Sequence, residues 1–88
     1  MAQDDAEAER WMRLAAEQGN AKAQDILGFM YFDGRGMSLN YVQAFMWWSI
    51  AASHGQKRAV GARDVVANMM TAEQVAEAQR LAREWAPN

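Results

Sequence analysis

The 88-residue chain is long enough for one domain with a modest core and too short for a second independent domain. Hydrophobic residues make up 51% of it, which favours a globular fold and excludes a disordered tail. Nine Lys and Arg against eleven Asp and Glu leave a net charge of −2 with scattered charges, so neither nucleic acid nor an acidic membrane is an expected partner.

The chain contains no Cys, which excludes a disulfide framework and a thiolate zinc site. Residues 1–10 lack the apolar segment of a signal peptide, and no stretch approaches the apolar length of a membrane span. We therefore expect no membrane insertion and a cytoplasmic protein.

A shift of 36 residues superposes the chain on itself without gaps. The matched pairs are Ala8 and Ala44, Trp11 and Trp47, Ala15 and Ala51, Ala16 and Ala52, Gly19 and Gly55, and Ala23 and Ala59. A fixed period of this length is typical of stacked helical hairpins. The repeat therefore predicts that Trp11 and Trp47 occupy equivalent places in the core of consecutive units.

The first unit, about residues 4–36, is expected to be a pair of helices. Apolar residues with helical spacing predict a first helix from residue 4 or 5 to about 18, ended by Gly19 in a left-handed conformation. A second helix follows over about 21–32. Gly28 and the neighbouring alanines are expected to let these two helices approach closely, with Trp11 and Tyr31 filling the space beyond them.

The second unit, about residues 40–69, begins after a turn at 33–36. Asn40 is a good N-cap for a helix over about 40–54, whose apolar residues cover more than one face and predict burial on two sides. Trp48, Met46 and Ile50 widen this apolar arc. Two explanations stay open: they pack against adjacent units, or they form an adaptable groove for a partner.

The fourth helix, about 56–68, departs from the repeat because Arg63 and Asp64 stand where the first unit has Leu27 and Gly28. Thr71 and Gln74 then have the form of a capping box, which predicts a fifth helix over about 71–86. One side of this helix is apolar and the other charged. We interpret it as a C-terminal cap that covers the last apolar face of the stack.

The pattern from Trp11 to Gly36, W-x-x-x-A-A-x-x-G-x-A-x-A-Q-x-x-L-G-x-x-Y-x-x-G-x-G, resembles the Sel-one-like repeat, a relative of the tetratricopeptide repeat. The resemblance implies an all-α fold, an α-α superhelix of two helix-turn-helix repeats plus a capping helix. It also implies an adaptor that holds other proteins on a concave surface. Because residues 61–64 depart from the family pattern, the resemblance does not predict the geometry of the fourth helix.

Side chains that could catalyse a reaction are few in this sequence. His54 is the only histidine, and its place in the last turn of a helix favours a structural role. The Asp33-Gly34-Arg35-Gly36 segment lacks the ligands of a phosphate or calcium loop, and Asp4 and Asp5 suit the first turn of a helix better than a metal site. We expect no enzyme, no metal and no cofactor.

We instead expect a partner to bind the concave surface of the stack. In such stacks the first helix of each pair lines that surface. A helical wheel places a mixed strip of six residues there, suited to a helix or an extended peptide. The strip consists of Arg10, Arg13, Glu17, Met46, Ser49 and Ser53.

Self-association is the alternative. Two units and a cap are few for a stable stack, and the N-terminal face around Met12 and Ala16 is expected to be open. Either further repeats precede residue 1 in a longer protein, or two chains pair as a homodimer.

Overall fold

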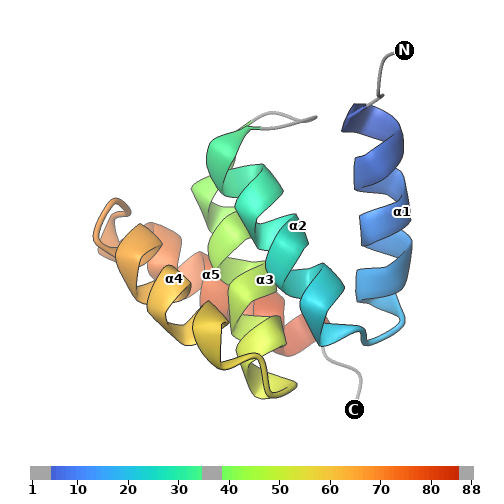
Figure 1. Cartoon of the computed structure of the whole chain (residues 1–88). Coiled ribbons are helices and arrows are strands. Elements are labelled where there is room, and N and C mark those ends of the chain that lie inside the picture. Colours follow the sequence, from blue (N-terminus) through green and yellow to red (C-terminus); the bar gives the residue numbers. More distant parts are fainter. Residues whose placement is uncertain (1–4, 35–38, 86–88) are drawn as a thin grey trace.

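The computed structural model describes residues 5–34 and 39–85, and within these ranges it contains five α-helices and no strand (Figure 1). The predicted all-α stack of helical hairpins with a C-terminal helix is confirmed, and each helix begins and ends within one residue of the predicted bounds. The helices are α1 (Asp5–Glu17), α2 (Ala21–Asp33), α3 (Tyr41–Ser53), α4 (Lys57–Ala67) and α5 (Ala72–Trp85).

Local signals account for where the helices end. Gly19 and Gly55 both adopt a φ of 97°, the left-handed conformation that reverses the chain between α1 and α2 and between α3 and α4. The Asn40 side chain accepts a hydrogen bond from a backbone N–H in the first turn of α3. Thr71 and Gln74 exchange two 3.0 Å hydrogen bonds and form the predicted capping box of α5.

Helix α3 is the centre of the stack. It packs against α2, α4 and α5, whereas the main contact of α1 is with α2 (Figure 1). In that view α5 passes behind α3. Met46, Trp48 and Ile50 are all buried, so the explanation by packing against adjacent helices is the correct one for the wide apolar arc of α3.

The two adjacent tryptophans of α3 point to different sides of the helix. Trp48 packs in one cluster with residues of α4 and α5, and Trp47 packs in another with residues of α1, α2 and α5. The Trp47 ring meets Trp85 of α5 edge to face, with 5.2 Å between ring centroids. Helix α5 therefore contributes to both clusters.

Gly28 has a different neighbour from the one predicted. It faces α3 rather than α1, and a Cβ atom placed there would lie 2.6 Å from Nε1 of Trp48. The same Nε1 donates a 3.1 Å hydrogen bond to the backbone carbonyl oxygen of Asp25. The glycine is thus needed because the Trp48 indole lies directly on the backbone of α2.

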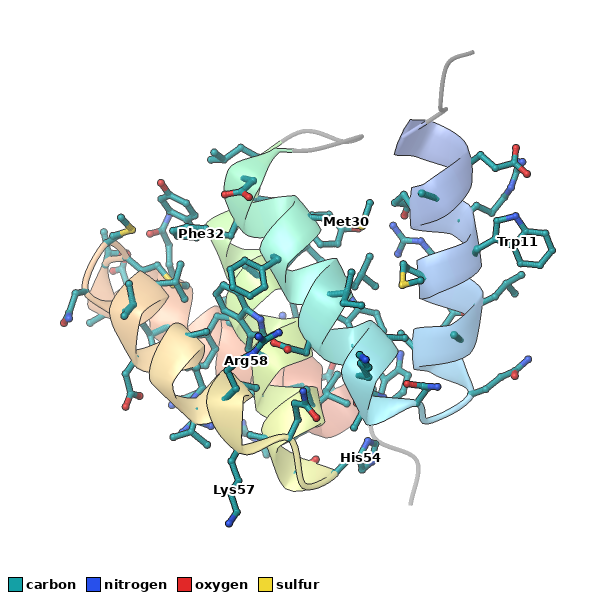
Figure 2. The ribbon with its side chains drawn as sticks, in the orientation of Figure 1. Trp11, Met30, Phe32, His54, Lys57 and Arg58 are labelled. Atoms are coloured by element: carbon teal, nitrogen blue, oxygen red, sulfur yellow. The ribbon has the colours of Figure 1, made fainter. Side chains whose placement is uncertain are left out.

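The prediction that Trp11 lies in the core is wrong. Trp11 is 61% exposed, whereas its repeat equivalent Trp47 is 2% exposed. Figure 2 shows Trp11 on the side of α1 that faces away from the other helices. The physical reason is that α5 lies over Trp47 with Trp85, while no described helix lies over the outer face of α1. The open N-terminal face consequently carries Trp11 and Leu14, and not Ala16, which is fully buried.

The C-terminal helix caps a different surface from the one expected. Its principal contacts are with α3, so it closes the side of the central helix rather than the end of the stack at α4. Val60, Val65 and Met69 stay exposed on or just after α4. Arg63 and Asp64 leave α4 helical throughout, so the departure from the repeat does not disturb the backbone.

Two fully buried polar side chains of α2 connect the helices. Gln24 donates a 2.9 Å hydrogen bond from Nε2 to the carbonyl oxygen of Ala16, and its Oε1 lies 3.0 Å from Nδ1 of His54. Oδ2 of Asp25 accepts hydrogen bonds from Arg58 at 2.6 and 3.1 Å and from Gln56 at 3.3 Å. These bonds tie α2 to α1, to the end of α3 and to the start of α4.

Gly28→Ala should lower the free energy of unfolding by about 1–3 kcal/mol, because the added methyl group forces the Trp48 indole away from α2. Urea unfolding monitored by circular dichroism measures the change. Gly61→Ala is the matched control, since a methyl group added at this helical glycine would have no atom within 4 Å, and it should raise stability by roughly 0.5–1 kcal/mol. Equal effects of the two substitutions would contradict the steric explanation.

Arg58→Met should destabilise the fold by about 1–3 kcal/mol, because it leaves the buried Asp25 carboxylate with Gln56 as its remaining side-chain donor. Arg80→Met is the control. Arg80 pairs with Glu77 and Glu84 on the exposed face of α5, where water screens the pairs, so its loss should leave the urea midpoint unchanged. An Arg58→Met variant with the same urea midpoint as the unchanged chain would show that Asp25 does not need this partner.

Candidate functional site

The six residues predicted for the partner strip do not form one continuous surface. Arg10, Arg13 and Glu17 lie on α1, and Met46, Ser49 and Ser53 lie on α3. Helix α1 makes its main contact with α2, and Met46, which the strip needs to join its two halves, is buried. The residues of α1 and those of α3 therefore belong to separate surfaces.

Met46 cannot face a partner, and the expectation that it points outward is wrong. It is 6% exposed and packs in the cluster that contains Trp47 and Ile50. Residues of α1, α2 and α5 enclose this side of α3. The helical wheel of α3 alone could not show these neighbours.

Arg13 holds α1 against α2. Its guanidinium donates hydrogen bonds to Glu9 and to Oη of Tyr31, the latter at 2.5 Å, and lies 5.8 Å from the centre of the Tyr31 ring. Burial would lower the pKa of the Arg13 guanidinium, but the hydrogen bonds to Tyr31 and Glu9 outweigh burial and raise this pKa above its usual value. Arg13 therefore has a structural role in the free chain.

Arg10 and Glu17 are exposed on α1. Arg10 donates a 3.2 Å hydrogen bond to Glu7, which also accepts a 3.2 Å hydrogen bond from the Trp11 indole. A partner role for Arg10 and Glu17 stays a prediction.

Ser49 and Ser53 line two hollows that lie where α5 passes α3. Ser49 borders both of them, so the hollows adjoin. The first, which we call the Arg63 hollow, has a volume of about 390 Å³ and is lined by Phe45, Ser49, Arg63, Asp64, Ala67, Val75 and Gln79. The second, which we call the Ser53 hollow, has a volume of about 230 Å³ and is lined by Ser49, Ile50, Ser53, Ala82 and Arg83.

Sequence reasoning did not find Arg63, Gln79 and Arg83 as lining residues. The one available signal was the departure from the repeat at residues 63–64, where the pattern expects Leu-Gly and the chain has Arg-Asp. That departure pointed to helix geometry, and its effect is instead to place charged side chains beside α3 and α5.

The described chain offers little for catalysis or metal binding. Its histidine faces Gln24 rather than a hydroxyl group, and the Ser53 hydroxyl donates to the carbonyl oxygen of Ile50 at 2.7 Å. Among the described residues, no three His, Cys, Asp or Glu residues gather in a way that could hold a metal ion. The side chains of Asp4 and Asp5 lie outside the described part.

The turn after α2 is described as far as Gly34. Gly34 has a φ of 75° and donates from its N–H to the carbonyl oxygen of Met30, which is an ordinary helix end. Residues 35 and 36 of the segment considered as a ligand loop lie outside the described residues. None of the described helices has the length and apolar character needed to cross a membrane. The expected cytoplasmic location stays a prediction.

Comparison with known proteins gives two kinds of match. The chitin synthase regulator SKT5 of Saccharomyces cerevisiae is 40% identical over 57 residues, which are 65% of this chain and 8% of that protein. The chitin synthase regulator SKT5 of Malassezia restricta is also 40% identical over 57 residues, again 65% of this chain and 4% of that protein. The chain therefore spans only a small part of the length of these curated relatives.

The Sel1 repeat matches residues 1–20 and 21–56, which together make up well over half of the chain. The second match has the same 36-residue length as the internal period and contains α2 and α3, the pair joined by Gly28 and Trp48. The division into units at 4–36, 40–69 and 71–86 stays a prediction. With its period, its helical hairpins and this match in agreement, the chain belongs to the Sel1 repeat family.

Proposed function

We propose that this chain is a non-catalytic adaptor that binds a partner protein or peptide on the face where α5 passes α3. The observation that supports this proposal most is the pair of adjoining hollows that share Ser49. Sel1 repeats generally mediate protein–protein interaction, so a surface of this kind is the expected working part of the chain.

The Ser53 hollow combines polar and apolar groups in a way that suits a peptide. Ser53 and Arg83 supply polar groups at its rim, while Ile50 and Ala82 supply apolar surface. A peptide with one apolar face and one acidic or polar face would match this combination, as in other helix and groove complexes.

The relatives are consistent with a role that acts on another protein. Both are named as regulators of chitin synthase, and the 57 matched residues make up most of this chain. A protein that regulates an enzyme acts on another protein, which agrees with a binding module. This similarity supports the non-catalytic part of the proposal and leaves the identity of the partner to experiment.

Ser53→Arg should remove partner binding, because a long charged side chain would fill the Ser53 hollow without disturbing the core. The measurement compares proteins that the immobilised chain and its variants retain from an extract of its own cells, quantified by mass spectrometry. A partner bound at this face should fall by about tenfold or more, the effect of losing roughly 1.4 kcal/mol.

Ala76→Arg is the matched control, since it adds the same side chain at an exposed position of α5 that lines neither hollow. It should retain the partner as the unchanged chain does. Equal retention by all three proteins would rule out this face, and a chain that retains nothing above an empty matrix would rule out the adaptor itself.

Self-association is a second candidate function, favoured by the exposed apolar stripe of α1. Trp11 and Leu14 lie one turn apart on its outer face, and the equivalent Trp47 is covered by Trp85 of a neighbouring helix. We propose a second copy of the chain as the occupant. A two-fold pair would bury both stripes at once, and the oppositely charged Glu7 and Arg10 at their margin would allow complementary contacts.

Trp11→Glu should convert a two-fold pair into monomers, because it places a charge at the centre of the apolar stripe. Sedimentation velocity over a range of concentrations measures the effect. Glu73→Gln, a change on the exposed side of α5, serves as the control and should leave the pair intact. A chain that sediments as a monomer at all concentrations would exclude this candidate.

A further inference from the structure

The acidic Asp64 lines the Arg63 hollow together with three polar side chains, from three different helices, that can donate hydrogen bonds. They are Ser49 of α3, Arg63 of α4 and Gln79 of α5. Within the described part of the chain, none of the three makes a side-chain hydrogen bond to another protein group. Phe45 and Val75 add apolar walls to the same hollow. Polar groups that converge on a partly apolar depression are a feature of ligand sites.

Arg63 stands at a position where the repeat uses a buried leucine. Its equivalent in the preceding unit is Leu27, which is fully buried between helices. The Arg63 side chain keeps 29% of its surface exposed and carries a charge into the hollow beside α3. At this partly exposed place the arginine adds a charge that the buried leucine of the first unit does not have.

Asp64 does not use up the donors of Arg63. Its Oδ1 lies 3.9 Å from Nε of Arg63, at the outer limit of an ion pair, and 72% of the Asp64 side chain is exposed. Exposed pairs of this length contribute little because water screens them. The N–H donors of both Nη groups therefore remain available. They form the edge of the guanidinium that binds a carboxylate through two parallel hydrogen bonds.

We propose that the Arg63 hollow binds a carboxylate of the partner polypeptide, either an acidic side chain or the C-terminal carboxylate. The guanidinium of Arg63 donates two hydrogen bonds to it, and the Ser49 hydroxyl and the Gln79 amide donate to the remaining lone pairs. Phe45 and Val75 contact the adjoining apolar atoms of the ligand. A volume of about 390 Å³ admits the end of one residue. This inference rests on the proposed adaptor function and specifies what the adaptor recognises.

The test uses small carboxylates in place of the partner. N-acetyl-L-leucine presents a C-terminal carboxylate, N-acetyl-L-glutamic acid α-amide presents a side-chain carboxylate, and N-acetyl-L-leucinamide is the uncharged control. Each is titrated into the isotopically labelled full chain, and NMR follows the backbone amides of Ser49 and Gln79 and the Nε–H of Arg63. We expect saturable shifts at these three groups with one or both carboxylates and none with the uncharged control, and the tighter carboxylate identifies the source.

Arg63→Gln should weaken carboxylate binding by about tenfold or more, because it removes the positive charge and the paired hydrogen-bond donors. Gln79→Ala, on the exposed side of α5, should weaken it less. Arg80→Gln is the matched control and should bind as the unchanged chain does, since Arg80 lines neither hollow and its donors are taken by Glu77 and Glu84. Circular dichroism verifies that each variant is folded.

The proposal is overturned if the carboxylates cause no shifts at these groups, or if Arg63→Gln binds them as tightly as the unchanged chain. Neither result depends on the identity of the partner. A chain that retains its partner through the Ser53 hollow but binds no carboxylate would keep the adaptor function and reject this inference. Carboxylate binding by a chain that retains no partner would keep the carboxylate site and reject the adaptor function.

Discussion

The close approach of α2 and α3 is the contact on which the rest of the structure depends. The Trp48 indole lies on Gly28, donates its N–H to the carbonyl oxygen of Asp25 and meets the Phe29 ring edge to face at 5.2 Å. A large flat side chain can lie there only because α2 has no Cβ at that position. Aromatic burial and a satisfied indole N–H together set the distance and the rotation of the two helices.

The rotation of α3 also decides where the other elements lie. Trp48 is directed towards the backbone of α2 near Gly28. Consecutive side chains of a helix point in different directions, so the preceding residue, Trp47, faces α5 and contacts Trp85. Helix α5 is thereby held against α3 rather than against α4. The two hollows that share Ser49 arise along this α3–α5 contact, so the candidate binding face is a consequence of the tryptophan pair.

The candidate site was only partly accessible from the sequence. Helical periodicity, a local property, predicts that Ser49 and Ser53 lie on one side of α3; both line hollows there, and their role towards a partner stays a prediction. Met46 is buried because three other helices enclose it, and Arg13 has a structural contact with Tyr31 of α2 that the sequence did not predict. Such neighbours come from residues distant in the chain, which a single helical wheel does not contain. The same holds for Arg63, because Ser49 and Gln79, which line the hollow with it, come from other helices.

Sequence alone accounts for the helices, their ends and their 36-residue period, because caps, turns and apolar spacing act within a few residues of one another. It also determined the family, since the repeat pattern lies in the order of residues. Which of the two equivalent tryptophans is buried depends instead on how the helices pack. Trp11 and Trp47 stand at equivalent positions of the repeat, but the presence of a covering helix is a property of the assembled stack.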